Sequence, residues 1–300
     1  MTKKRPDTRI QKHGNGHSYY LDGAKIPGVT TILGNGIPKP ALVGWAGNTV
    51  ADFVVDRLDV ADDGKTIIAD RLVDDALEWN GSRGSHAAKT SNDRLPRLGL
   101  ARILGSIRYR DSTAAAAKGT VVHKLAERLA LGEEIEVPEG TEGHVDSYLR
   151  FLELWQPEDA LVEVVVVSRR YRYMGKTDLI CYSDPLGDWV RENVNPDLEG
   201  PARCLLDIKT SRSGIFPETA LQLHGYGFAE TIVDNAGDEE PLGEFDFFGA
   251  VWVRADGFDL VPIRIDPNTH RAFLYAQQVG NWLSREGGSA DAILPAIFAG

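Results

Sequence analysis

The succession of strand-type and helix-type segments constrains the fold of this chain more than any other feature. Residues 162–167 form a nearly continuous β-branched run, and shorter strand-type runs follow it. The strands predicted from these runs span residues 162–167, 171–173, 177–182, 204–209, 245–254 and 259–265. Helical patterns over residues 217–233 and 267–284 lie among them, whereas the polar residues 183–203 predict a long loop. Strands and helices mixed within one stretch favour an α/β core from about residue 161 to residue 285.

The N-terminal part of the chain has a different character. Its first dozen residues are charged and predict no regular structure. Asp22-Gly23 then marks the turn of a small hairpin within residues 19–30. Helical patterns follow over residues 30–33, 38–58, 66–79, 96–108, 112–131 and 142–155. We therefore predict a hairpin and helical region at residues 1–110, a core at residues 111–286 and a tail at residues 287–300, all within one compact unit.

The composition excludes several classes of site. Cys181 and Cys204 are too few for a disulfide framework, a four-thiolate zinc site or an iron–sulfur cluster, and their apolar surroundings predict buried free thiols. No apolar stretch approaches the length of a membrane span, and no signal region follows the charged N-terminus, so we expect a cytoplasmic chain without a membrane. The net charge of -11 disfavours a nonspecific nucleic-acid coat but allows a local groove that binds a polyanion.

One local concentration of positive charge stands out against this acidic background. Arg169, Arg170, Arg172 and Lys176 lie close together in the sequence between residues 161 and 178. They are typical of an exposed hairpin with solvated arginines, and they are also candidates for contacts with a polyanion. We take Arg170 as the candidate substrate-binding residue of this group.

The triplet Asp207-Ile208-Lys209 carries the clearest chemical signal. It ends the apolar run that begins at Cys204, so Asp207 and Lys209 are expected on one face of a strand and Ile208 on the other. Asp178 ends the segment Gly175-Lys176-Thr177-Asp178 and offers a second carboxylate. Two carboxylates and the Ile208 carbonyl could hold a magnesium ion, and Lys209 could then position a water for attack on a phosphodiester. Taken alone, the triplet could also be an ordinary exposed strand end.

Further polar residues could belong to the same site. Gln222 and Tyr226 are four positions apart and share one helix face, where they could bind substrate or simply form a polar contact between helix and sheet. His123 lies in a helical pattern and could complete a metal site, although most helical histidines are structural. Glu163 could be part of the site or a charge at a strand edge.

Taken together, these motifs resemble those of the PD-(D/E)XK nuclease superfamily, and in particular its RecB-like branch of CRISPR-associated exonucleases and phage-type exonucleases. The resemblance rests on five elements in order: His123, Glu163, Gly175-x-x-Asp178, Asp207-x-Lys209-Thr210 and Gln222-x-x-x-Tyr226. Residues 26–33, 39–42 and 45–46 also resemble the N-terminal region of phage members.

The resemblance implies a restriction-endonuclease-like α/β core with a central mixed β-sheet flanked by helices. It implies metal-dependent hydrolysis of DNA, more exonuclease than endonuclease, in phage recombination, replication or degradation, with host cytoplasm as the compartment. Asp178 and Asp207 would bind Mg²⁺ or Mn²⁺ with His123 as a further ligand and Lys209 as the catalytic lysine. Gln222 and Tyr226 would orient the substrate, and Glu163 would be catalytic.

The resemblance also bears on cofactors and partners. The CRISPR-associated relatives hold an iron–sulfur cluster through four cysteines, and this chain has two, so we predict no cluster. DNA is the expected partner, and a homo-oligomer or a recombination or single-strand-annealing partner protein remains open. Two alternatives also remain: a catalytically inactive DNA-binding or assembly protein with the nuclease fold, and an unrelated α/β protein in which the motifs coincide.

Overall fold

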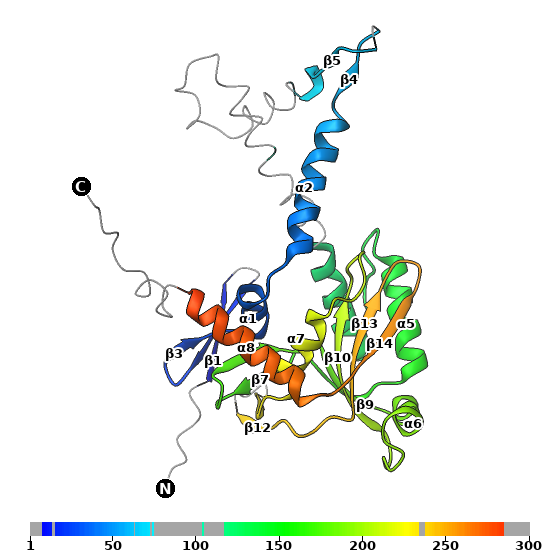
Figure 1. Ribbon diagram of the computed structural model, residues 1–300. Coiled ribbons are helices and arrows are strands. Elements are labelled where there is room, and N and C mark those ends of the chain that lie inside the picture. Colours follow the sequence, from blue (N-terminus) through cyan, green and yellow to red (C-terminus); the bar gives the residue numbers. More distant parts are fainter. Residues whose placement is uncertain are drawn as a thin grey trace, which may run out of the picture. The chain divides into compact units, whose positions relative to one another are not determined.

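The computed structural model describes residues 8–13, 16–62, 64–72, 74, 104, 117–233 and 238–284 (Figure 1). The chain divides into two compact units: residues 1–38 with 119–300, and residues 39–118. The boundaries predicted after residues 110 and 286 fall outside the described residues, as do the tail at residues 287–300 and, apart from Leu104, the helix predicted at residues 96–108.

The larger unit is built on a five-stranded mixed sheet. Its strands are β6 (Glu158–Val162), β9 (Leu179–Ser183), β10 (Ala202–Lys209), β13 (Phe247–Val253) and β14 (Phe258–Ile263), in the order β14-β13-β10-β9-β6. Only the pair β10–β13 is parallel, and the other neighbours are antiparallel. The predicted α/β fold with a central mixed sheet is therefore confirmed at this level.

Helices cover both faces of this sheet. The helix over residues 117–130, α5 (Glu142–Trp155) and α6 (Asp184–Asn193) pack on one face, while α1 (Val29–Gly36), α7 (Glu218–Gly227) and α8 (Pro267–Leu283) pack on the other (Figure 1). The alternation along β10 sets the two cores: Cys204, Leu206 and Ile208 belong to the first, and Leu205 belongs to the second. Both cysteines are free and buried, as predicted.

A second layer of strands extends the larger unit beside α1 and α8. A four-stranded antiparallel sheet has the order β12-β11-β7-β8 and comprises β7 (Val165–Ser168), β8 (Tyr173–Lys176), β11 (Thr231–Val233) and β12 (Glu239–Pro241). A three-stranded sheet comprises β1 (Thr8–His13), β2 (Gly16–Leu21) and β3 (Ala24–Ile26). Arg169 joins the two sheets through ion pairs with Glu239 at 2.6 Å and Asp22 at 3.3 Å. Asp22 and Gly23 both have positive φ, so the predicted hairpin turn is confirmed.

The smaller unit is described in part. It contains α2 (Pro40–Val55) and the antiparallel pair β4 (Asp59–Val60) and β5 (Ile67–Ile68). Arg71 donates two hydrogen bonds to the Asp59 carboxylate, at 3.0 and 2.6 Å. The helix predicted from residue 66 is wrong at its start, because pairing with β4 holds residues 67–68 in a strand.

Five other local predictions are also wrong. The strand predicted over residues 171–173 starts only at Tyr173, because residues 169–172 form the turn before β8. The predicted loop at residues 183–203 contains α6, whose N-cap Ser183 accepts a hydrogen bond from the Leu186 N–H at 3.2 Å. The helix predicted to residue 233 ends at Gly227, and the β-branched residues 231–233 pair with β7 as β11. The single strand predicted over residues 162–167 is two strands in different sheets, separated at Glu163, which has φ +55°. Residues 8–13, expected to lack regular structure, form β1.

A buried histidine fixes the junction between α7 and α8. His224 Nε2 accepts a hydrogen bond from the Asp266 N–H at 2.9 Å, and Nδ1 lies 2.6 Å from the Ala220 carbonyl oxygen. This pairing requires a neutral ring with its proton on Nδ1. The ring stacks on Phe228, which stacks in turn on His270. Burial lowers the pKa of both histidines, to about 4 for His270.

None of the described helices combines the length and the apolar character needed to cross a bilayer.

Candidate active site

The two candidate metal-binding carboxylates come from neighbouring strands of the central sheet. β9 pairs with β10 in a register whose last pair is Leu179 with Leu206, and Asp178 and Asp207 are the residues next to that pair. The negative charge of Asp178 acts on the pKa of Asp207, so the two carboxylates lie near each other. Asp178 Oδ2 also accepts a hydrogen bond of 2.7 Å from the Ile208 backbone N–H, which fixes its orientation. The sheet itself therefore brings the two carboxylates together.

Asp207 and Lys209 point to the same face of β10, as the alternation predicts, while Ile208 lies in the opposite core. Lys209 Nζ lies 2.6 Å from Asp207 Oδ2 and donates a hydrogen bond of 2.9 Å to Gln222 Oε1. Gln222 Nε2 lies 2.8 Å from Asp207 Oδ1, to which it donates, and 3.1 Å from the Tyr226 hydroxyl. Gln222 of α7 thus contacts both Asp207 and Lys209 and holds the two side chains together.

Gly175 explains how Tyr226 reaches this position. A Cβ atom at residue 175 would lie 2.5 Å from Tyr226 Cε1, which is too close for any side chain. The glycine lets β8 approach the buried tyrosine ring directly, and the ring then presents its hydroxyl to Gln222. The first residue of the Gly175-x-x-Asp178 motif therefore serves packing around the site.

The electrostatics of the two carboxylates differ. Burial raises the pKa of Asp207 to about 6, and the negative charge of Asp178 adds to this effect despite the opposing charge of Lys209. Burial also acts to raise the pKa of Asp178, but its contacts with His123 and the Ile208 N–H outweigh burial and lower that pKa. Of the two carboxylates, Asp207 is therefore the one whose negative charge is disfavoured when no cation is bound.

Among the described residues, Asp207 Oδ2 is a buried atom without a hydrogen-bond partner. Its close neighbour is the ammonium of Lys209, which forms an ion pair with it at 2.6 Å. A buried carboxylate oxygen in this state, facing a second carboxylate, is suited to a hard divalent cation. The donor set therefore fits the predicted Mg²⁺ or Mn²⁺.

His123 lies beside this pair. Its Nδ1 is 3.4 Å from Asp178 Oδ1. Burial acts to lower the pKa of His123, but the hydrogen bond and charge of Asp178, with the charge of Asp207, outweigh burial and raise it. In the described part of the chain, no three His, Cys, Asp or Glu side chains are placed to hold an ion by themselves. The role of His123 as a further ligand therefore stays a prediction.

Glu163 is near the site through its backbone and directs its side chain to a lysine. Its N–H donates to the Asp178 carbonyl at 3.1 Å, and its carboxylate forms an ion pair with Lys176. The left-handed backbone at Glu163 is the point where the chain leaves β6 for the second sheet. A catalytic role for Glu163 stays a prediction.

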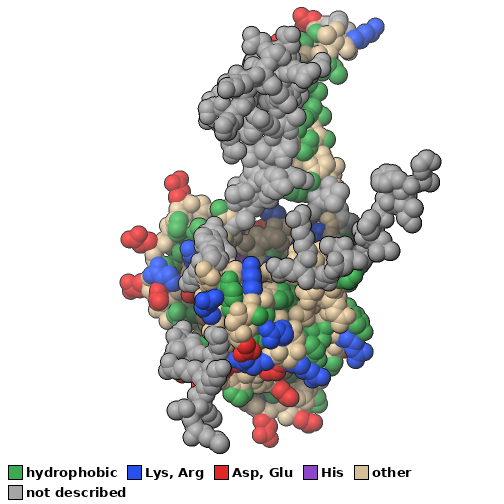
Figure 2. All heavy atoms as spheres, turned by 90° about the vertical axis from the view of Figure 1, so that its left-hand side faces the viewer, with side chains coloured by type: hydrophobic (Ala, Val, Ile, Leu, Met, Phe, Trp, Pro, Cys, Tyr) green, Lys and Arg blue, Asp and Glu red, His purple; other side chains and the backbone are tan. Residues whose placement is uncertain are grey.

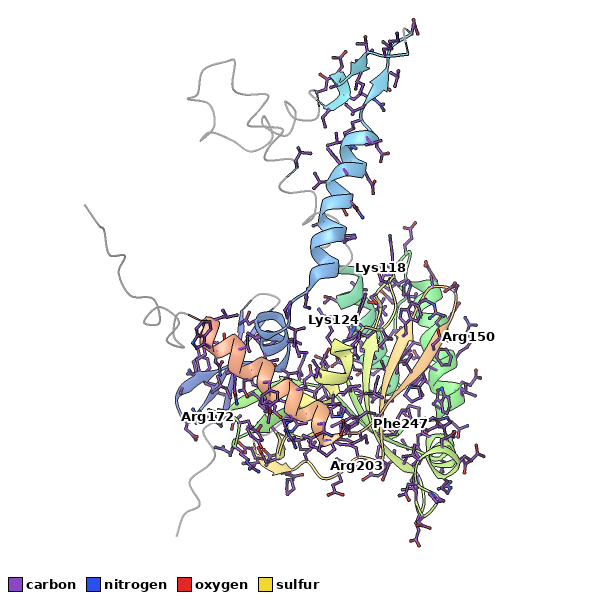
Figure 3. All side chains as sticks on the ribbon, in the orientation of Figure 1. Lys118, Lys124, Arg150, Arg172, Arg203 and Phe247 are labelled. Atoms are coloured by element: carbon purple, nitrogen blue, oxygen red, sulfur yellow. The ribbon has the colours of Figure 1, made fainter. Side chains whose placement is uncertain are left out.

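Arg170 is not brought to these residues. It lies exposed in the turn between β7 and β8, and its guanidinium is 5.1 Å from the centre of the Tyr171 ring. Figure 3 shows Arg172 of the same turn well apart from Lys124, which follows His123 on the helix over residues 117–130. Figure 2, seen from the side of β1 and β3, shows Lys and Arg side chains dispersed over that face. Any DNA contact of Arg170 would therefore lie outside the carboxylate cluster.

Two hydroxyl groups near Asp178, those of Tyr148 and Thr177, were not predicted from the sequence. Burial raises the pKa of Tyr148, and the negative charge of Asp178 raises it further, which places the phenol near that carboxylate. In the described residues, neither the Tyr148 hydroxyl nor that of Thr177 has a hydrogen-bond partner. Thr177 adjoins Asp178 in the sequence and could have been considered, whereas no spacing links Tyr148 on α5 to the site.

No protein-family model matches the sequence, and the search of curated proteins returns no match.

Proposed function

We propose that this chain is a metal-dependent nuclease that hydrolyses phosphodiester bonds in DNA on a PD-(D/E)XK-type core. The observation that carries the proposal is the cluster at adjoining ends of β9 and β10: Asp178 accepts a hydrogen bond from the Ile208 N–H, its charge acts on Asp207, and Lys209 Nζ lies 2.6 Å from Asp207 Oδ2. This arrangement joins two carboxylates and one ammonium group in one partly buried cluster. A structural ion pair would need only one of the carboxylates.

Asp178 and Asp207 would hold the divalent ion, with the Ile208 carbonyl and His123 as further candidates. The bound ion would stabilise negative charge on the phosphate and lower the pKa of a water molecule. Remaining ligands in such sites commonly come from water and phosphate oxygens. The Ile208 N–H keeps Asp178 in one orientation before the ion arrives.

Lys209 would act on the reacting groups directly. Its ammonium has three protons, of which one is donated to Gln222 and another faces Asp207. The third can be donated to a phosphate oxygen or to the attacking water. Gln222 and Tyr226 orient the lysine, so their effect on the reaction would pass through Lys209.

The test is digestion of DNA by the purified full-length protein. End-labelled linear DNA and closed circular DNA, each single- and double-stranded, are incubated with and without Mn²⁺ or Mg²⁺. We expect metal-dependent cleavage of linear DNA, and sparing of the circles if the enzyme is an exonuclease. Asp207→Ala and Lys209→Ala should each lower the rate by a large factor, on the order of a hundredfold or more, because both groups act in the transition state.

Matched surface variants control for nonspecific effects. Asp188→Ala on α6 and Lys25→Ala on β3 remove exposed groups of the same charge and should retain full activity. Full activity in Asp207→Ala or Lys209→Ala would overturn the assignment of the site. DNA binding without cleavage at any metal concentration would instead support the inactive nuclease-fold alternative.

A further inference from the structure

The loop between β10 and α7 follows Lys209 of the candidate active site directly. It covers residues 210–217 and connects the end of β10 to the helix that carries Gln222. Because Gln222 contacts Lys209, the loop starts at the carboxylate cluster and ends about one helical turn from it. Side chains that this loop exposes therefore lie at the edge of the candidate active site.

The loop is held in one conformation by β13 and by its own hydrogen bonds. Trp252 Nε1 of β13 donates a hydrogen bond of 2.7 Å to the Ser211 carbonyl oxygen. The Ser211 hydroxyl donates to the Gly214 carbonyl oxygen at 2.6 Å. Gly214 has φ +92°, which glycine adopts readily, and it faces the Trp252 ring. The loop is therefore fixed before any ligand binds.

The helix over residues 117–130 packs against the start of the loop. A Cβ atom at Gly119 would lie 3.0 Å from Thr210 Oγ1, so the glycine allows a close approach. On the same helix, His123 Nδ1 is 3.4 Å from Asp178 Oδ1. The helix and the loop therefore both border the carboxylate cluster.

Phe216 is a large apolar side chain left exposed at the end of this fixed loop. It is 45% exposed, and its carbonyl oxygen accepts a hydrogen bond of 2.9 Å from the Thr219 N–H at the start of α7. Six residues separate it from Gln222, or roughly 9 Å at 1.5 Å per residue. The ring is therefore close enough to contact a base next to a phosphate held at the carboxylates.

Two exposed cations lie in the same surroundings. Arg212 belongs to the loop, and Lys124 follows His123 on the neighbouring helix. Neither forms an ion pair or a hydrogen bond within the part of the chain that the structure describes. Arg128, further along that helix, is instead paired with Glu133 at 2.7 Å. In a chain with a net charge of -11, unpaired cations beside the reacting groups favour a polyanion at this place.

We propose that the loop at residues 210–217 binds single-stranded DNA, with Phe216 stacked on an unpaired base and Arg212 bound to a phosphate. The inference rests on the proposed nuclease function and names the form of DNA that the site takes. Exposed aromatic rings bind single strands by stacking on the faces of their bases. In a duplex, neighbouring base pairs cover those faces, so Phe216 favours unpaired strands over intact duplex.

The test measures binding by fluorescence anisotropy with labelled single- and double-stranded oligonucleotides of one sequence, in EDTA so that no DNA is cleaved. Phe216→Ala should weaken single-strand binding on the order of tenfold, the effect of losing one stacked base, and leave duplex binding nearly unchanged. Arg212→Ala should weaken both and lower the slope of log affinity against log salt by about 1.

Matched variants separate stacking from structural damage. Phe216→Trp keeps an aromatic ring and should keep the preference for single strands. Tyr275→Ala and Arg271→Ala remove an exposed aromatic ring and an exposed cation from α8, and both should bind DNA as the wild type does. Far-UV circular dichroism and thermal unfolding check that each variant is folded.

Two results would overturn the proposal: equal affinity of the wild type for single and double strands, and unchanged single-strand binding in Phe216→Ala. Cleavage in Mn²⁺ is measured separately. A wild type that cleaves DNA while Phe216→Ala binds normally would refute the role of the loop and leave the nuclease function standing. A wild type that never cleaves but binds single strands through Phe216 would do the reverse.

Discussion

Replacement of Asp207 by Asn should make the metal-free protein more stable while abolishing the proposed nuclease activity. Asn keeps the shape of the side chain, and its Oδ1 can still accept the hydrogen bond from Gln222 Nε2, but it removes a buried negative charge near Asp178. In the wild type, burial and the neighbouring carboxylate raise the pKa of Asp207 to about 6, against an ordinary value of 3.8. Ionisation of Asp207 therefore opposes folding at neutral pH.

The magnitude follows from this difference in pKa. A carboxyl group whose pKa is raised in the folded state contributes stability that is present below its unfolded pKa and is lost as the pH rises through the folded value. Between pH 4 and pH 7 the wild type should thus lose about 3 kcal/mol relative to Asp207→Asn, at about 1.36 kcal/mol for each pKa unit. Loss of the Lys209 ion pair is already included, because that charge acts on the same pKa.

The assay is urea denaturation of both proteins with EDTA at a series of pH values. The two should have similar free energies of unfolding near pH 4, and Asp207→Asn should be the more stable by a few kcal/mol above pH 7. Asp188→Asn, which neutralises an exposed carboxylate of α6, should change stability by less than about 0.5 kcal/mol at any pH. An Asp207→Asn protein that is less stable than the wild type at pH 7 would refute the reasoning.

Addition of metal completes the experiment. Mn²⁺ or Mg²⁺ should stabilise the wild type, since an ion that binds only the folded state shifts the equilibrium by mass action. Asp207→Asn should gain much less from the same concentration. Equal stabilisation of the two proteins would place the ion elsewhere.

Other predictions concern the packing around the site. Acid should destabilise the Asp207→Asn protein, which lacks the opposing titration of Asp207. The pKa values of His224 and His270 are lowered by burial, so their contribution is complete above about pH 6.5 and is lost as the pH falls towards 4, which thermal unfolding between pH 7 and pH 4 would detect. Gly227→Ala should cost about 1–3 kcal/mol, because its Cβ would lie 2.2 Å from Phe248 Cζ. Gly34→Ala, with no atom within 4 Å of the added carbon, should instead stabilise α1 by about 0.5–1 kcal/mol in urea denaturation. Reversal of that order between the two variants would contradict the packing described at α7.

The fold was predictable from the sequence where one signal dominated. The strand at residues 204–209 and the helix from residue 267 were predicted correctly. An apolar run marks the strand, and a proline stands at the start of the helix. The helix α6 was missed because its polar residues hid the spacing of Leu186 and Val190, which are buried four positions apart. The strand β11 was assigned to a helix because its pairing partner, β7, is more than 60 residues away in the sequence.

The site was predictable to a similar degree. Strand alternation correctly placed Asp207 and Lys209 on one face, and helical spacing correctly joined Gln222 to Tyr226. The strand period and the helix period each describe one element, so neither predicts a contact between a strand and a helix. The contact between Lys209 and Gln222 could therefore only be assumed. Arg170 was proposed from local charge, and it lies exposed in the turn between β7 and β8, beside Tyr171.

The sequence by itself determined which groups can meet within one element, because the periods of strands and helices are local properties of the backbone. The tertiary structure alone decided the rest. The end of the β9–β10 ladder brings Asp178 near Asp207, and packing of α7 on the sheet brings Gln222 to both members of the Asp207–Lys209 pair. These contacts join residues up to about 30 positions apart or on different elements, and they depend on how whole layers pack, which no local pattern specifies.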